Sequence, residues 1–394
     1  MHVARWATRR GRAATAATVV ALGLLAAADG SVQAPQSGLL DWQPDERARI
    51  LSLGPWPPPA VADASNRVSR QPAAIAFGEA LFHTTRLSRV PGLRCASCHA
   101  PWRQFTDGRR TGLGAAPGDR NTPTLLNIAQ QRWFGWDGAN DNLWAQSIRP
   151  LLDEREMRAD AAFVAAQLRA DERLAAMYRN GFGREPPADD TLLMVDLAKA
   201  LAAFQETLVS GRTPFDVFRD ALARHDDAAA AAYPLAAQRG LRLFIGRAQC
   251  VDCHAGALFS DGRFHAVTIR SQRADGTFDE GRTAGLAHWA ASPFALAGRF
   301  NDGNARSVPE AAMAGAFRTP PLREVAATGP YMHDGSIAKL CDALQAHALP
   351  SEALPRPGAR PLNTREREDL VAFLISLSAQ GVPAHVERAS LRCL

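Results

Sequence analysis

Apolar residues recur every three or four positions in four stretches of the chain, a period typical of amphipathic helices. The stretches predicted as helices are residues 72–82, 190–208, 238–245 and 363–374. Asp190 can cap the second helix, and Asn363 can form a capping box at the start of the fourth. No region is rich in strand-like alternation, so we expect a mainly α fold with long loops.

The first residues follow the pattern of a secretory signal. Basic residues precede an apolar run, residues 13–28, that is too short to span a bilayer comfortably. We expect cleavage near Ala34, so residues 1–34 are predicted as a signal peptide, with an uncleaved membrane anchor as the alternative. Residues 35–70 are rich in proline and are predicted as an extended lead-in. The protein is therefore expected to be periplasmic, with no membrane contact beyond its signal segment.

Two pentapeptides of the form C-x-x-C-H carry the residues that covalent haem c requires. They are Cys95-Ala96-Ser97-Cys98-His99 and Cys250-Val251-Asp252-Cys253-His254. The two thiols of each motif can form thioethers with the vinyl groups of one porphyrin, and the histidine can ligate the iron. One motif alone could be a zinc site or a redox C-x-x-C, but two complete copies in an exported chain favour two haem c groups.

A second segment repeats together with the haem motif. Phe105-Thr106-Asp107-Gly108-Arg109 follows the first motif, and Phe259-Ser260-Asp261-Gly262-Arg263 follows the second at nearly the same offset. Because a predicted helix also precedes each motif, we expect two related cytochrome c-like haem domains, residues 71–215 and 216–382, and a tail, residues 383–394. Arg109 and Arg263 could neutralise haem propionates or cap surface turns.

Composition and charge exclude several other classes of protein. The chain has 394 residues, of which 46% are hydrophobic and 22% charged, which is too apolar for a disordered chain. The formal net charge of +5 comes partly from arginines of the signal segment, so we expect no nucleic-acid partner. Cys341 and Cys393 remain outside the haem motifs, and they could form a disulfide or stay as two free thiols.

Further stretches of the chain resemble the bacterial di-haem cytochrome c peroxidases, the family that also contains the tryptophylquinone-maturing enzyme MauG. The stretches are Arg120-Asn121-Thr122-Pro123-Thr124, Trp136-Asp137-Gly138, Phe317-Arg318-Thr319-Pro320-Pro321-Leu322-Arg323 and Thr328-Gly329-Pro330-Tyr331-Met332-His333-Asp334-Gly335. They run in the family's order. The resemblance implies two unequal haems: the haem on His99 reacts with hydrogen peroxide, and the haem on His254 transfers electrons.

The resemblance also implies roles for single residues around the first haem. Glu156 falls on the family's distal glutamate, which helps to cleave the O–O bond. Gln146 and Pro150 fall on distal-pocket residues, and Trp136 falls on the tryptophan between the haems. A carboxylate can take one proton from peroxide and return it to the leaving oxygen. Without the resemblance, a residue such as Glu156 is more often a helix-surface charge, and a residue such as Trp136 is more often part of the core.

A calcium ion lies between the haems of this family. Its ligands fall here on the side chain of Asn121 and on the carbonyl oxygens of Thr328 and Pro330. Few protein ligands and several waters are acceptable for calcium. The resemblance therefore implies a calcium site, which the sequence alone would not suggest.

The chain departs from the ordinary peroxidases at two haem ligands. No histidine lies between Ala100 and Trp136, so the first haem is expected to keep an open or water-bound position, as in the MauG branch. The sixth ligand of the second haem, methionine in peroxidases and tyrosine in MauG, falls on His347. Bis-histidine ligation would lower the potential of that haem. Alternatively, His347 is a surface or core residue and Met313 or Met332 is the ligand.

Two functions of different classes follow from these features. The first is an enzyme that reduces hydrogen peroxide, with a small cytochrome c, a cupredoxin or, in a MauG-like variant, a side chain of a partner protein as the electron donor. The second is a non-catalytic di-haem electron carrier, which would need both irons saturated by protein ligands. The missing distal histidine and the position of Glu156 favour the enzyme.

Overall fold

The computed structural model describes residues 38–266, 272–273, 275–309, 311–348, 361–381, 386 and 392–393. The α-helices are α1 (Pro44–Ser52), α2 (Pro72–His83), α3 (Cys95–Cys98), α4 (Leu143–Leu152), α5 (Ala161–Ala170), α6 (Glu172–Phe182), α7 (Asp190–Gln205), α8 (Pro214–Ala223), α9 (Asp227–Ala230), α10 (Leu235–Ile245), α11 (Arg282–Ala291), α12 (Leu340–Ala348) and α13 (Thr364–Ile375). The 3-10 helices are η1 (Pro101–Arg103), η2 (Ile128–Gln130), η3 (Cys250–Asp252) and η4 (Val325–Ala327). Strands β1 (Phe264–Ala266) and β2 (Ala316–Arg318) pair antiparallel, with His265 opposite Phe317. The predicted signal peptide and most of the predicted tail lie outside the described residues.

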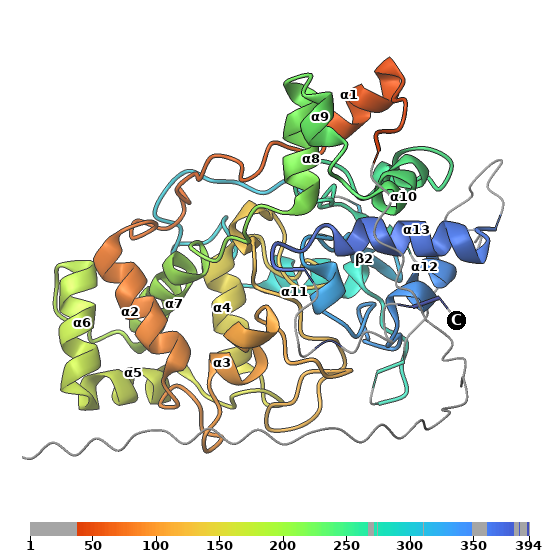
Figure 1. Cartoon of the computed structure of the whole chain (residues 1–394). Coiled ribbons are helices and arrows are strands. Elements are labelled where there is room, and N and C mark those ends of the chain that lie inside the picture. Colours follow the sequence, from red (N-terminus) through yellow and green to blue (C-terminus); the bar gives the residue numbers. More distant parts are fainter. Residues whose placement is uncertain are drawn as a thin grey trace, which may run out of the picture. The chain divides into compact units, whose positions relative to one another are not determined.

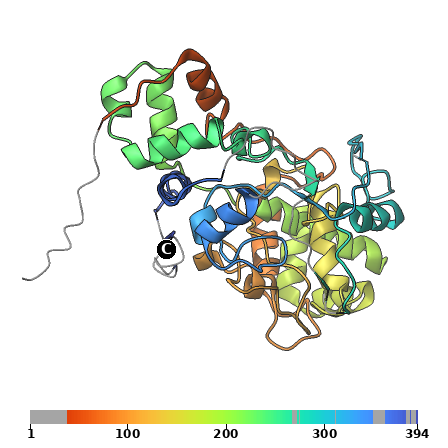
Figure 2. The ribbon, with the colours of Figure 1, turned by 90° about the vertical axis from the view of Figure 1, so that its right-hand side faces the viewer.

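Two hydrophobic cores organise the described chain, one beside each haem motif. Helices α2, α4, α5, α6 and α7 supply most of the first core, and α1, α8, α10, α12 and α13 supply most of the second. Figure 1 shows α2, α5, α6 and α7 gathered together and α12 beside α13. In Figure 2, α1 lies against the green helices α8 to α10. The mainly α fold that the periodicity predicts is therefore confirmed.

Both cores contain the same helix crossing, in which two backbones touch at a glycine. A methyl group on Gly78 of α2 would lie 1.9 Å from the carbonyl oxygen of Ala200 in α7. A methyl group on Gly240 of α10 would lie 1.9 Å from the carbonyl oxygen of Asp369 in α13. Only glycine permits so close an approach. The haem motifs contact these crossing helices, α3 on α2 and η3 on α10, so each crossing fixes the position of its motif.

The predicted helices are present with small shifts at their ends. The N-cap of α7 is Asp189 rather than Asp190, and its carboxylate accepts the backbone N–H of Leu192 at 3.0 Å. Asn363 and Glu366 form the predicted capping box of α13. As expected, α13 packs on the second core, mainly against α10.

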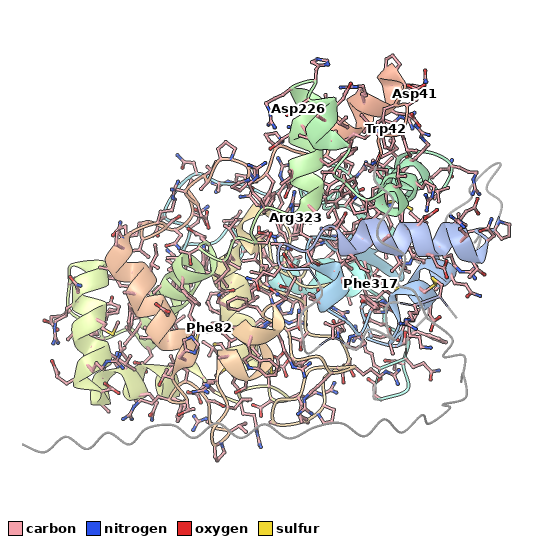
Figure 3. The ribbon with its side chains drawn as sticks, in the orientation of Figure 1. Asp41, Trp42, Phe82, Asp226, Phe317 and Arg323 are labelled. Carbon is pink, nitrogen blue, oxygen red and sulfur yellow. A yellow bond between two sulfur atoms is a disulfide. The ribbon has the colours of Figure 1, made fainter. Side chains whose placement is uncertain are left out.

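The proline-rich lead-in differs from the predicted extended chain. Its first part forms α1, where Pro44 occupies the first turn and Gln43 and Glu46 make a capping box. Ile50 is fully buried in the second core, and Trp42, labelled in Figure 3, is nearly so. The prolines predict extended backbone, but burying these apolar side chains favours a helix that packs on α8 and α10.

The remaining cysteines form a disulfide. Cys341, at the start of α12, is bonded to Cys393, with 5.3 Å between their Cα atoms. The bond ties the tail to α12 and confirms the first of the two alternatives for this pair. The four haem-motif cysteines stay free. Within the described residues, every helix is too short or too polar to cross a bilayer.

Gly78→Ala is expected to lower the free energy of unfolding by about 1–3 kcal/mol, because the new methyl group must push α2 away from α7. Gly240→Ala should do the same in the second core. Gly181→Ala in α6 is the matched control, since its methyl group would meet no atom closer than 3.4 Å. That variant should be neutral or up to about 1 kcal/mol more stable, because alanine favours helix. Denaturant unfolding measures all three; equal stabilities of Gly78→Ala and Gly181→Ala would contradict a tight crossing.

Candidate functional site

The histidine of each haem motif is held by a backbone carbonyl. His99 Nδ1 lies 3.0 Å from the carbonyl oxygen of Phe105, and His254 Nδ1 lies 3.0 Å from that of Phe259. A carbonyl oxygen only accepts, so Nδ1 carries the proton in both rings. Nε2 is then the nitrogen that can ligate a metal, the arrangement that commonly orients metal-bound histidines.

The repeated F-[ST]-D-G-R segment supplies these carbonyl groups. Phe105 and Phe259 both have left-handed backbone angles, with φ of 57° and 55°. A bulky residue rarely adopts this conformation, so the surroundings must hold it there. The fully buried ring of Phe259 provides such a hold in the second domain. This backbone conformation directs the phenylalanine carbonyl to the histidine, which explains why the segment accompanies both haem motifs.

The aspartate of this segment closes a turn beneath the arginine. Asp107 accepts the backbone N–H of Arg109 at 2.9 Å, and Asp261 accepts that of Arg263 at 3.0 Å. Both arginines are exposed, and neither lines the cavities beside the haem motifs. The propionate and surface-turn alternatives for Arg109 and Arg263 both stay predictions.

The first motif opens on a cavity of about 340 Å³ with a partly polar lining. The predicted site residues that line it are Cys95, Cys98, His99, Trp136, Gln146, Pro150 and Glu156. Gln146 and Pro150 lie one turn apart on α4, so they share a helix face. Gln146 Oε1 accepts the Asn140 side-chain amide at 2.9 Å, which orients the glutamine. The structure therefore brings the predicted distal residues and the first haem motif together.

A loop that the sequence did not single out holds Glu156. The carbonyl oxygen of Glu156 accepts the N–H of Ala115 at 3.0 Å, and a methyl group on Gly114 would lie 2.5 Å from the Glu156 Cα. Gly114 thus allows the loop to lie directly against Glu156. Burial among the residues of the cavity raises the pKa of Glu156, with Arg149 opposing the shift and Asp153 adding to it. A glutamate that keeps its proton to higher pH is suited to proton transfer.

The second motif opens on a more apolar cavity of about 240 Å³, lined by Cys250, Cys253, His254 and His347 among others. Burial, together with the nearby His347, lowers the pKa of His254 to about 4, so the ring is neutral, as an iron ligand must be. His347 Nδ1 lies 2.9 Å from the carbonyl oxygen of Ala343 one turn earlier in α12. Nδ1 therefore carries the proton of His347, and Nε2 is the nitrogen suited to a metal.

The alternative ligands of the second haem are placed differently. Met313 is 48% exposed and is not among the residues that line the second cavity. Met332 and Tyr331 both line it. His347 and Met332 thus both lie beside the second motif, and Met313 does not.

The two cavities share part of their lining, which includes Trp136, Asn121 and Arg318. Trp136 Nε1 donates to the carbonyl oxygen of Asn121 at 2.8 Å, and the carbonyl oxygen of Trp136 accepts the N–H of Arg318 at 2.8 Å. The tryptophan is therefore fixed between the two cavities by bonds from its ring and from its backbone.

An ion-pair network that the sequence did not reveal surrounds this junction. Arg120 donates two hydrogen bonds to Asp279, both at 2.7 Å, and lies 2.6 Å from Asp137. Against the effect of burial, Arg120 holds the pKa of Asp137 below its usual range. These paired charges join the R-N-T-P-T stretch to the W-D-G stretch, which places Asn121 beside Trp136.

The predicted calcium ligands Asn121, Thr328 and Pro330 all line the second cavity. Asn121 Nδ2 donates to the carbonyl oxygen of Arg109 at 2.9 Å, which fixes the orientation of the amide. The backbone N–H of Asn121 donates to the carbonyl oxygen of His333 at 2.8 Å. The calcium site stays a prediction.

The residues present fit two covalently bound haems. In each cavity, two free thiols and a half-buried histidine protonated on Nδ1 meet a lining that includes many apolar residues. These are the groups that thioether attachment and axial ligation require.

Comparison with known proteins agrees with this geometry. Residues 72–223 match the family model of the di-haem cytochrome c peroxidases. The chain is 37% identical over 315 residues to the methylamine utilization protein MauG of Methylorubrum extorquens, covering 78% of this chain and 79% of that protein. It is 32% identical over 363 residues to the cytochrome-c peroxidase IdrP1 of Denitromonas iodatirespirans, covering 84% and 87%.

The fold is similar to the crystal structure of the di-haem peroxidase BthA from Burkholderia thailandensis. The TM-score is 0.64 at 22% identity, covering 84% of this chain and 96% of that one. This likeness supports the fold, and the relatives in sequence support the family. The chain belongs to the di-haem cytochrome c peroxidase and MauG family and is an oxidoreductase of that kind, with haem c as its cofactor.

Proposed function

We propose that the protein is a periplasmic peroxidase that reduces hydrogen peroxide at the haem on His99, with electrons delivered through the haem on His254. The observation that carries this proposal is the difference between the two cavities. The first contains Glu156 and Gln146, which can handle protons and hydrogen bonds. The second contains His347 and a more apolar lining. Peroxide reduction needs an open iron position and a proton-transfer group, whereas electron transfer needs neither.

The lining of the first cavity supports an open iron position. His99 is the only histidine among the described residues that line it. A non-catalytic carrier would need a second protein ligand at this haem. The described lining offers no second imidazole, and its methionine, Met157, is packed in the first hydrophobic core. The same feature favours the MauG-like branch over the ordinary peroxidases.

Each distal residue has a separate task in this proposal. The haem iron, when bound, supplies the redox chemistry of O–O cleavage. The Glu156 carboxylate accepts a proton from one peroxide oxygen and returns it to the leaving oxygen. Gln146 Oε1 is engaged by Asn140, so Nε2 is the group that can donate to peroxide. Pro150 forms part of the cavity wall and, having no N–H, cannot give the usual helical hydrogen bond to the carbonyl oxygen of Gln146 one turn earlier.

Electrons cross between the cavities beside Trp136, which lines both. The donor is either a small redox protein, such as a cytochrome c or a cupredoxin, or a side chain of a partner protein, as in a MauG-like enzyme. A calcium ion held by Asn121, Thr328 and Pro330 would stiffen the same junction.

Carbon monoxide binding tests the peroxidase against the carrier. Protein matured in the periplasm should carry two haem masses, and its reduced form should bind carbon monoxide at one haem only, because one iron lacks a sixth protein ligand. Intact-mass measurement and visible spectra give both results. Cys95→Ala/Cys98→Ala is the control, which should keep the second haem and lose the binding. Two haems that both refuse carbon monoxide would indicate the carrier.

Glu156→Gln should slow the reaction with peroxide by about 10²–10⁴-fold without loss of haem, because the positioned proton acceptor is removed. Glu154→Gln is the matched control: this neighbour is exposed, and among the described residues its ion pair is with Arg158 at the surface. Stopped-flow spectra measure both rates. Equal rates in the two variants would remove Glu156 from the mechanism.

The parent enzyme should also lose rate as the pH falls through the raised pKa of Glu156. The carboxylate form accepts the proton, and it is present above that pKa and lost below it. Since burial raises the pKa, the fall begins at higher pH than for an exposed glutamate. The charges facing Glu156 are Arg149, Asp153 and Arg155. A fall that persists in Glu156→Gln would belong to another group.

His347→Ala should abolish a low-spin bis-imidazole signal in the electron paramagnetic resonance spectrum and leave the high-spin signal of the first haem. The reason is that His347, on α12, shares the second cavity with His254. Met332→Ala is the matched control and should leave both signals unchanged. If Met332→Ala removes the low-spin signal and His347→Ala does not, the methionine is the ligand.

A further inference from the structure

Arg318, at the end of β2, is a buried cation that lacks a carboxylate partner among the described residues. Its side chain is 5% exposed, and burial lowers the pKa of the guanidinium to about 10. The side chain makes two hydrogen bonds to described residues. Both are long, and both go to backbone carbonyl oxygens. Nε donates to Gly135 at 3.4 Å and Nη1 donates to Thr319 at 3.3 Å.

Two other buried cations of the chain have carboxylate partners. Arg323, labelled in Figure 3, donates to both carboxylate oxygens of Asp216 at 2.9 and 3.0 Å. Lys199 Nζ lies 2.6 Å from a carboxylate oxygen of Asp302. A buried charge without a counterion is strongly unfavourable. The setting of Arg318 therefore calls for an anion that the described part of the chain does not provide.

The second observation about Arg318 is its position beside both haem cavities. The residue lines both haem cavities and donates its backbone N–H to the carbonyl oxygen of Trp136 at 2.8 Å. The preceding residue, Phe317, is labelled in Figure 3 and stacks on His333, with 3.6 Å between ring centroids. Strand pairing and this stack hold the backbone of β2 firmly, so the guanidinium has a fixed place beside the two cavities.

We propose that Arg318 is a carboxylate-binding site that pairs with propionate groups of both haems and raises both reduction potentials. Each haem c carries two propionates on the edge away from its thioethers. The planar guanidinium has five N–H donors, of which two bond to backbone carbonyl oxygens, so three remain to bind carboxylates of the two haems. The inference rests on the haem c cofactors of the family and not on peroxide chemistry.

The expected effect on the potentials follows from charge. Reduction of ferric haem adds one electron, so a nearby cation stabilises the reduced form relative to the oxidised form. Removing that cation, and leaving a propionate without its partner, should disfavour reduction at both haems. Coulomb interactions are strong in a water-poor interior, so the effect should exceed that of any exposed arginine.

Potentiometric titration of Arg318→Met tests this site in the haem-loaded protein. Methionine keeps much of the length and removes the charge. The reduction equilibrium of each haem should become about tenfold less favourable, which is a fall of 59 mV for a one-electron couple. Arg224→Met is the matched control, because Arg224 is exposed at the end of α8 and lines neither cavity. It should leave both potentials unchanged.

Potentials of Arg318→Met that equal those of the parent would overturn the proposal, and a fall at one haem only would overturn the shared site. If Arg318→Met is recovered without both haems, Arg318→Lys decides. Lysine restores the cation, so both haems and reduction equilibria within about threefold of the parent are expected. Loss of haem from the lysine variant as well would show that the shape of arginine, rather than its charge, is needed, and would also overturn the proposal.

Discussion

The close crossing of two helices in each core is the constraint on which the remaining structure depends. At Gly78 and at Gly240 the backbones touch, so neither helix can shift without opening the core. The haem motifs contact these helices, and the position of each histidine is thereby fixed relative to its cavity. A motif of five residues has no core of its own. The crossing supplies the rigidity that covalent attachment and axial ligation need.

The two domains hold the haem-motif histidine in the same way and differ in the residues that line their cavities. In both, a phenylalanine with a left-handed backbone presents its carbonyl to the haem-motif histidine, so the proximal side is repeated. The difference comes from segments after the repeat. Residues 136–156 bring a glutamate and a glutamine to the first cavity, and α12 brings His347 to the second. The two cavities therefore differ through the segments that follow a repeated scaffold.

Features encoded by neighbouring residues were predictable from the sequence. The helix periods, the capping box at Asn363 and the repeated haem motif belong to this group, and the resemblance added Trp136 and Glu156 to one site. The helix in the lead-in was missed because buried Ile50 outweighs the nearby prolines, a tertiary effect. Arg318 was missed for the same reason. Its burial depends on the pairing of β1 with β2, which are about fifty residues apart in the sequence. Arg109, by contrast, is conspicuous in the sequence because it belongs to the repeated segment, but its side chain is exposed.

The proposed cation beside both cavities and the proposed His347 ligand in one of them would control different quantities. A charge that acts on both haems moves the two potentials in the same direction and leaves the difference between them largely unchanged. An axial ligand acts on its own iron alone, so it sets that difference. Arg318 and His347 would therefore act on the two haem potentials independently. Arg318 would set how readily a donor reduces either haem, and His347 would set which haem the electron occupies. Because the carbonyl oxygen of Trp136 accepts the backbone N–H of Arg318, the proposed electron route and the proposed shared charge would lie on two directly bonded segments.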